Sequence, residues 1–146
     1  MTGLVFVDAN ILLYAANRAA PEHNAAHRFL QNRLSSDDPL FLCWEVIHAF
    51  LRISTSPGIF PDPLSPNHAA EWIQSILDLP GVSTLSPSQE SWLILRRELQ
   101  EIPVRGRLLT DAVIASQLEA SGVRHLYSAD ADFRKFLWLK VVNPLL

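Results

Sequence analysis

Four acidic side chains follow apolar segments of the sequence or begin helical ones. They are Asp8, Glu45, Asp111 and Asp130. If the fold brings them together, their like charges repel one another, and a divalent cation that prefers oxygen ligands relieves this repulsion best. The four residues therefore predict a site for Mg²⁺ or Mn²⁺, and metal sites of this kind often act on phosphates. Asp132, close behind Asp130, is a further candidate ligand that is equally suited to cap the short helix after it.

Short apolar runs alternate with amphipathic segments along the chain. The sequence predicts strands at residues 4–7, 40–43, 82–85, 125–128 and 141–142. It predicts helices over about 9–17, 22–34, 44–55, 66–79, 87–101, 108–121 and 132–136. Two of the helices begin with a serine cap followed by proline, in Ser65-Pro66 and Ser86-Pro87. This alternation predicts an α/β fold in which helices cover both faces of a parallel sheet.

The four acids fall at the same edge of such a sheet. Right-handed crossovers place the carboxyl ends of parallel strands along one edge, and ligands bind there, where the strand order reverses. Asp8 and Asp130 lie at the carboxyl ends of predicted strands. Glu45 and Asp111 lie in the first turns of predicted helices, which face the same edge. We therefore expect all four carboxylates to converge.

Composition restricts the class of protein. The chain has 146 residues, 49% of them apolar, which predicts one packed domain over residues 1–146. The lone Cys43 allows no disulfide within the chain, and the N-terminus lacks the pattern of a signal peptide. No apolar run has the length of a membrane span, so we expect a cytoplasmic protein without a membrane partner. The net charge of −3 argues against nucleic-acid binding by bulk charge, although bound divalent ions would offset it.

With these residues placed, the chain resembles the PIN-domain ribonucleases of the VapC toxin type. The resemblance covers nearly the whole chain through motifs that occur in the family's order and at its spacing. The motifs are Val7-Asp8-Ala9-Asn10-Ile11-Leu12, Glu45, Leu109-Thr110-Asp111-Ala112-Val113-Ile114-Ala115 and Ser128-Ala129-Asp130-Ala131-Asp132-Phe133.

The resemblance implies both a topology and a function. The implied PIN-like fold has three layers, with a five-stranded parallel sheet in the order 3-2-1-4-5 flanked by helices. In that order strands 1 and 4 are neighbours, so Asp8 and Asp130 meet where the strand order reverses. The implied function is that of a toxin of a toxin–antitoxin pair, an endoribonuclease that uses Mg²⁺ or Mn²⁺ and is inhibited by a cognate antitoxin protein. A homodimer is also implied.

Two polar residues next to the acids are candidates for holding them in place. The hydroxyl of Ser128 is suited to orient a carboxylate or a metal-bound water, and the alternative is an ordinary turn serine. Asn10 is suited to hydrogen-bond an acid of the site, and the alternative is a polar residue of the first helical turn. Many relatives have threonine at the position of Ser128, a change that keeps the hydroxyl.

Arg105 and Arg107 lie shortly before Asp111 and are candidates for contacting RNA phosphates. The alternative is a solvated loop, the usual state of short charged runs. Many relatives carry a Gly-Asn pair here, where this chain has Arg105-Gly106-Arg107-Leu108. The substitution of Arg107 for asparagine is expected to alter contacts with the substrate.

The expected reaction is hydrolysis of a phosphodiester bond with departure of the ribose 3′ oxygen, which leaves a 5′-phosphate and a 3′-hydroxyl. This route requires no pair of catalytic histidines. Two alternatives belong to other classes. A phosphatase of the haloacid dehalogenase type also has an aspartate after its first strand, but it normally has a second acid where this chain has Asn10. It also needs a late lysine, and neither Lys135 nor Lys140 is well placed for that role. A PIN-like binding module without activity is disfavoured because all four acids are present.

The antitoxin is expected to cover the early helices. An arginine from such a partner can pair with both oxygens of one carboxylate in the acidic cleft. The apolar surface that supplies the affinity is expected to include Leu12, Tyr14 and Phe50.

Overall fold

The computed structural model describes residues 3–146. One parallel sheet contains β1 (Val5–Val7), β2 (Leu40–Cys43), β3 (Val82–Leu85), β4 (His125–Tyr127) and β5 (Lys140–Val142). The strand order is β3-β2-β1-β4-β5, so β1 lies between β2 and β4. The predicted α/β class and strand order are both confirmed, and the order reverses between β1 and β4.

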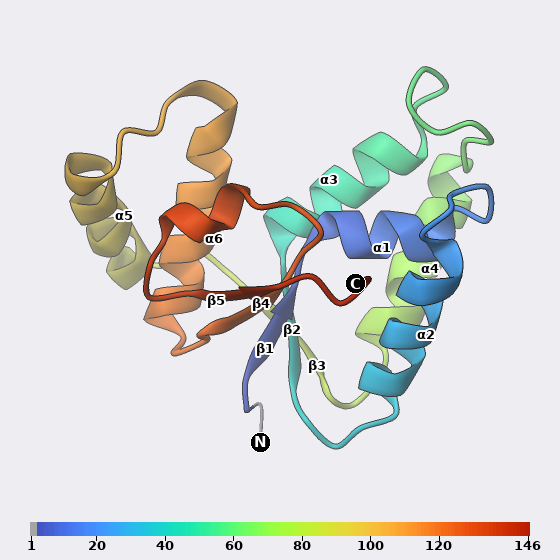
Figure 1. The fold of residues 1–146 in the computed structure, drawn as a ribbon, viewed down its shortest axis with the longest axis horizontal. Helices are drawn as coiled ribbons and strands as arrows, with labels where there is room; N and C mark the ends of the chain where they lie inside the picture. The colour runs from blue at the N-terminus through green and yellow to red at the C-terminus, as the bar shows by residue number, and fades with distance from the viewer. Residues whose placement is uncertain (1–2) are drawn as a thin grey trace.

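Helices flank the sheet in two groups (Figure 1). The helices are α1 (Ala9–Ala16), α2 (His23–Leu34), α3 (Trp44–Ser54), α4 (Pro66–Leu77), α5 (Gln89–Glu101) and α6 (Leu109–Ala120). Short 3₁₀ turns are η1 (Gly106–Leu108) and η2 (Asp132–Lys135). Helices α1 to α4 contact one another in sequence-adjacent or neighbouring pairs on the right of the view, whereas α5 packs along α6 on the left. The result is the expected three-layer arrangement.

The centre of the sheet is the most deeply buried part of the core. Val5, Phe6 and Val7 have no exposed surface, as expected for a central parallel strand covered on both faces. Burial of one phenylalanine such as Phe6 stabilises the fold by roughly 1.5–3 kcal/mol. Because β1 is held on all sides, its carboxyl end gives a fixed position to the residue that follows it.

Of the two serine caps predicted at helix starts, one is confirmed and one is wrong. Ser65 caps α4 as predicted, and its hydroxyl accepts a hydrogen bond from the His68 N–H at 3.1 Å. The prediction that Ser86-Pro87 begins α5 is wrong, because Ser88 is the cap. Ser88 and Ser91 exchange hydrogen bonds in a capping box, which satisfies two helix N–H groups at once. Ser86 instead accepts a hydrogen bond from the Trp44 indole at 3.2 Å.

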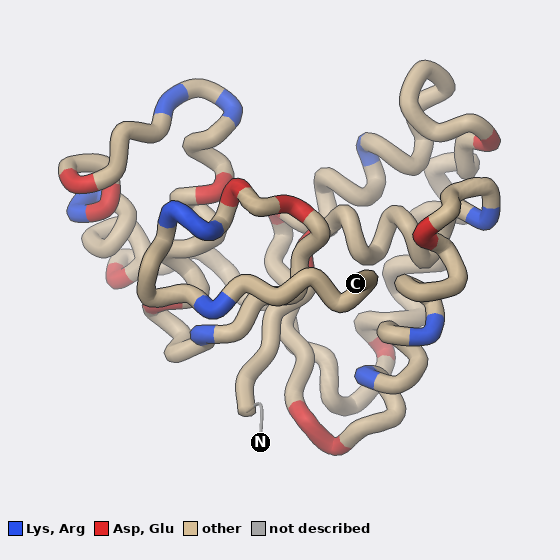
Figure 2. Tube along the Cα trace, viewed as in Figure 1, with Lys and Arg blue, Asp and Glu red and all other residues tan. Residues whose placement is uncertain are grey.

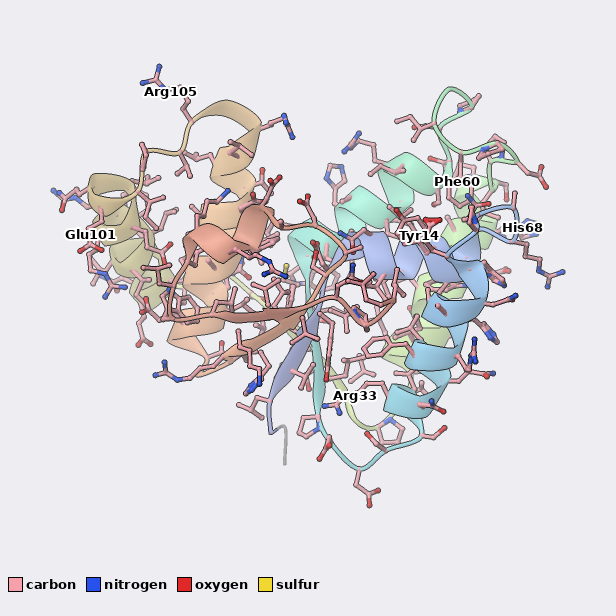
Figure 3. The ribbon with its side chains drawn as sticks, viewed as in Figure 1. Tyr14, Arg33, Phe60, His68, Glu101 and Arg105 are labelled. Carbon is pink, nitrogen blue, oxygen red and sulfur yellow. The ribbon has the colours of Figure 1, made fainter. Side chains whose placement is uncertain are left out.

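The apolar surface predicted on the early helices is wrong for two of its three residues. Leu12 and Phe50 are completely buried, and Phe50 stacks on Trp72 with ring centroids 4.8 Å apart. They face the core because α1, α3 and α4 pack on one another. A hollow of about 880 Å³ lies nearby, between the end of α1, the start of α2 and the loop before α4 that carries Phe60 (Figure 3).

None of the helices in residues 3–146 combines the length and apolar character that crossing a membrane requires.

Candidate active site

Asp8 follows the central strand and is held by several donors. One carboxylate oxygen, Oδ1, accepts the Ala9 N–H at 2.8 Å, so Asp8 caps α1. The other, Oδ2, accepts the Ser128 hydroxyl at 2.8 Å and a longer bond from the Asn10 amide at 3.4 Å. The backbone N–H of Asp8 donates to Tyr127 on β4 at 3.0 Å, which continues the sheet up to this residue. The capping and the site interpretations of Asp8 are therefore compatible.

Ser128 and Asn10 link the ends of β1 and β4. The Asn10 amide donates to Ser128 Oγ at 3.0 Å, and Asn10 Oδ1 accepts the Ala129 N–H at 3.1 Å. Ser128 Oγ also accepts the Asp130 N–H at 3.0 Å. With Ser128 only 1% exposed, its hydroxyl has partners in three directions and fixes both neighbouring acids.

The pKa of Asp8 depends on its burial and on the charges of nearby acids. Burial raises the pKa of the Asp8 carboxyl to about 6, from an ordinary value of 3.8. The hydrogen bonds from Ser128 and Ala9 lower this pKa in part, and the charges of Asp111 and Asp130 raise it further. Asp111 and Asp130 therefore lie close enough for their charges to act on Asp8, and the predicted convergence of all four acids stays a prediction.

Glu45 lies in the first turn of α3 and is held from across the fold. Its Oε1 accepts a hydrogen bond from the side-chain amide of Gln117 on α6 at 2.9 Å. Gln117 is 1% exposed, and its own Oε1 has no hydrogen-bond partner in the described part of the chain. Sequence reasoning missed this residue. The available signal was a polar side chain within the buried face of the helix that begins near Asp111.

Asp111 lies in the first turn of α6 and forms an ion pair. Its Oδ2 accepts a hydrogen bond from Lys135 Nζ at 2.9 Å. The prediction that neither lysine is well placed is thus wrong for Lys135, because η2 turns back from the end of β4 and brings the ammonium to α6. Lys140, at the start of β5, is exposed.

The remaining predicted residues are at the surface. Asp130 is exposed, and its Oδ1 accepts the Asp132 N–H at 3.0 Å in a tight turn. Asp132 is exposed in the first turn of η2. Arg105 and Arg107 are exposed around η1, and Arg105 extends outward from the loop between α5 and α6 (Figure 3). Neither arginine contacts an acid of the site in residues 3–146.

The donor set fits a hard divalent cation by its chemistry. Every candidate ligand is a carboxylate, and the charges of Asp111 and Asp130 act on the buried Asp8, an effect that a cation would offset. Acidic positions also gather near the centre of the view in Figure 2. As the side chains lie, no group of three or more His, Cys, Asp or Glu residues within 3–146 is arranged to hold an ion. In this arrangement Asp111 Oδ2 is paired with Lys135, and Glu45 Oε1 is paired with Gln117.

Comparisons with known proteins agree on one family. The PIN domain model matches residues 5–138. The chain is 34% identical to Ribonuclease VapC37 of Mycobacterium tuberculosis over 141 residues, which is 94% of this chain and 95% of that relative. It is 30% identical to Ribonuclease VapC48 of the same organism over 137 residues, which is 94% of each chain.

Solved structures share the fold at lower identity. One is VapBC2 from Rickettsia felis bound to a DNA fragment from their promoter, with a TM-score of 0.70, 15% identity, and coverage of 96% of this chain and 98% of that chain. Another is VapC20 of Mycobacterium tuberculosis, described as a sarcin–ricin loop cleaving toxin, with a TM-score of 0.64, 14% identity, and coverage of 89% and 92%. At these identities the similarity concerns the fold alone.

Proposed function

This chain belongs to the PIN-domain family, alongside the VapC ribonucleases, and we propose that it is an endoribonuclease that depends on Mg²⁺ or Mn²⁺ and acts as the toxin of a toxin–antitoxin pair. The observation that carries the proposal is the state of Asp8. Its carboxylate is buried, is fixed by Ser128 and Ala9, and lies in the field of Asp111 and Asp130. Such a group is poorly explained by capping alone, since a cap needs no further acids around it.

The proposed ligands are Asp8, Glu45, Asp111 and Asp130, with Asp132 at the rim. A bound divalent ion would supply an activated water and neutralise the charge that builds on phosphorus. The protein's own task is positioning. A hydrogen bond from Ser128 holds Asp8 in place before the substrate arrives, and a hydrogen bond from Gln117 limits the orientations of Glu45.

The proposed reaction is hydrolysis of the bond between phosphorus and the ribose 3′ oxygen. Water adds its oxygen to phosphorus, and the leaving 3′ oxygen takes up a proton. The products carry a 5′-phosphate and a 3′-hydroxyl. Arg105 and Arg107, on the exposed loop before α6, are proposed contacts for RNA phosphates farther along the strand.

The proposed partner is a cognate antitoxin protein, in line with the VapBC assemblies among the structural neighbours. The hollow beside α1 and α2, which has both polar and apolar lining residues, replaces the buried Leu12 and Phe50 as the proposed contact surface. A single domain over residues 1–146, a homodimer and a cytoplasmic location also stand as proposals. The comparisons favour neither the phosphatase nor the inactive binding module.

The test is cleavage of labelled RNA by the purified chain with Mg²⁺, with Mn²⁺ and with EDTA, alongside hydrolysis of p-nitrophenyl phosphate. RNA cleavage that requires metal and falls by at least about a hundredfold in Asp8→Asn is expected. Asp37→Asn, at an exposed position after α2, is the matched control and should retain activity. Wild-type cleavage by Asp8→Asn, or activity that persists in EDTA, would overturn the proposal. Hydrolysis of the phosphate monoester alone would favour the phosphatase instead.

A further inference from the structure

Lys135 is directed into the acidic site by its neighbours. It is the last residue of η2, and its side chain is 21% exposed beside the 19% exposed side chain of Asp111. Phe133 and Phe136 are 2% and 1% exposed, so the turn that carries the lysine is anchored in the core. The ammonium also lies 5.6 Å from the centre of the Phe136 ring. The backbone that carries Lys135 is therefore held in place by packing, which keeps the side chain next to Asp111.

The ion pair places a positive charge where the carboxylates repel one another. Of the ion pairs in residues 3–146, this one alone involves an acid of the site. Asp111 is also one of the two acids whose charge raises the pKa of Asp8. The ammonium thus offsets part of the negative charge of the site through the same carboxylate that a divalent ion would need.

A divalent ion bound to Asp111 would compete with Lys135 for this carboxylate. The ammonium occupies Oδ2 at 2.9 Å, and an ion bound to Asp111 in the same place would repel it. A lysine side chain is suited to move, because its compact charge lies on a flexible four-carbon stem. The anchored η2 backbone keeps the displaced ammonium close to the site, where the nearest new negative charge would be a phosphate of the RNA.

We propose that Lys135 neutralises Asp111 in the metal-free protein, is displaced from it by the divalent ion, and then binds a phosphate oxygen of the RNA at the cleavage site. The second half of this proposal rests on the proposed function, and the first half does not. Lys135 thereby acts as a built-in cation that keeps the empty site stable and becomes a substrate contact once metal is present.

Displacement can be followed directly because the chain has only two lysines, Lys135 and Lys140. Reductive ¹³C-methylation preserves the charge of both lysines and of the N-terminal amine and gives each a separate NMR signal, with the lysine signals assigned by use of Lys140→Met. Addition of diamagnetic Mg²⁺ is expected to shift the Lys135 signal, with the Lys140 signal unchanged. An unmoved Lys135 signal at Mg²⁺ concentrations that raise the melting temperature would overturn the proposal.

Variants separate displacement from substrate contact. Lys135→Met removes the competing charge, so it should bind Mn²⁺ about tenfold more tightly than wild type in calorimetry. At saturating Mn²⁺ it should cleave RNA at least about tenfold more slowly, since a donor to the phosphate is gone. Lys135→Arg should retain much of the activity, and Lys140→Met should match wild type in both measurements.

The outcomes decide separately whether Lys135 is displaced by the ion and whether it contacts a phosphate of the RNA. Unchanged or weaker Mn²⁺ binding by Lys135→Met overturns the displacement, and wild-type cleavage by that variant overturns the phosphate contact. If Lys135→Met fails to fold, Lys135→Gln and the NMR measurement on the wild-type protein decide. If wild type cleaves no RNA, the proposed function and the phosphate contact both fail, while the Mg²⁺ and Mn²⁺ titrations still decide the displacement.

Discussion

The two halves of the proposed acidic site are built in different ways. On the side of β1 and β4, Asp8, Asn10, Ser128 and Asp130 share interlocking hydrogen bonds between residues that follow adjacent strands. On the side of α3 and α6, Glu45 and Asp111 are each held by a single side-chain partner. The first half is a connected network, and the second consists of two independent contacts.

This difference indicates which half is fixed before a metal ion arrives. Removing one member of a connected network leaves several buried polar groups without partners, whereas removing a single contact frees one group. We infer that the strand half sets the position of the ion and that the helix half adjusts to it. Four predictions test this contrast, from the largest expected effect to the smallest.

The first prediction concerns pH and the metal-free protein. Because the pKa of Asp8 is raised to about 6 in the fold, the native state binds a proton more tightly than the unfolded chain does. Stability from this group is therefore full below about pH 4 and is lost as the pH rises through about 6, a change of about 3 kcal/mol. Asp8→Asn lacks this loss, so its free energy of unfolding relative to wild type should rise by that amount between pH 4 and pH 7.

Urea unfolding in EDTA measures this difference. Glu98→Gln is a useful comparison, because burial raises the pKa of Glu98 to about 7, and neither of its carboxylate oxygens has a hydrogen-bond partner within the described residues. The free energy of unfolding of Glu98→Gln relative to wild type should keep rising above pH 6. The corresponding difference for Asp8→Asn levels off there. Parallel curves for wild type and Asp8→Asn would contradict the shifted pKa of Asp8.

The second prediction concerns metal and stability. Mn²⁺ should raise the melting temperature of wild type and EDTA should reverse the rise, with a stabilisation of about 2.7 kcal/mol when the free ion is about a hundredfold above its Kd. The shift should disappear in the double variant Asp8→Asn, Asp111→Asn, which removes one ligand from each half. Thermal unfolding followed by circular dichroism measures it, and an equal shift in the double variant would exclude this site as the origin.

The third prediction removes the centre of the network. Ser128→Ala leaves Asp8, Asn10 and the Asp130 N–H each short of a partner, so unfolding should become easier by about 2 kcal/mol. Ser128→Thr should restore both stability and cleavage because it keeps the hydroxyl. Ser116→Ala is the matched control, since Ser116 is also buried but bonds only to the Val113 carbonyl of its own helix. If Ser128→Ala lowers the free energy of unfolding no more than Ser116→Ala does, the network is not cooperative.

The fourth prediction removes one contact from the helix half. Gln117→Leu deletes the donor to Glu45 and also removes a buried oxygen that has no partner in the described residues. Stability should therefore stay within about 1 kcal/mol of wild type. Mn²⁺ affinity should fall by about tenfold, because the carboxylate loses its orientation. Calorimetry with Gln100→Leu, an exposed position on α5, serves as control, and unchanged Mn²⁺ binding would remove Gln117 from the site.

The sequence by itself determined where the residues of the proposed strand half lie. An acid directly after an apolar run, as with Asp8, is placed at a sheet edge by local geometry, because strand and helix periods are read from neighbouring residues. The polar residues Asn10 and Ser128 were found for the same reason, since they lie within two residues of an acid. The alternation of strands and helices gave the α/β class, and the family resemblance added the strand order.

Only the tertiary structure decided the helix half and the apolar surface. Gln117 meets Glu45 from 72 residues away, and Lys135 meets Asp111 from 24 residues away. Such pairs depend on how α6 packs against α3 and how η2 turns back toward α6, and no local pattern encodes either. The burial of Leu12 and Phe50 has the same origin, because an amphipathic helix shows which face is apolar but not which neighbour will cover it.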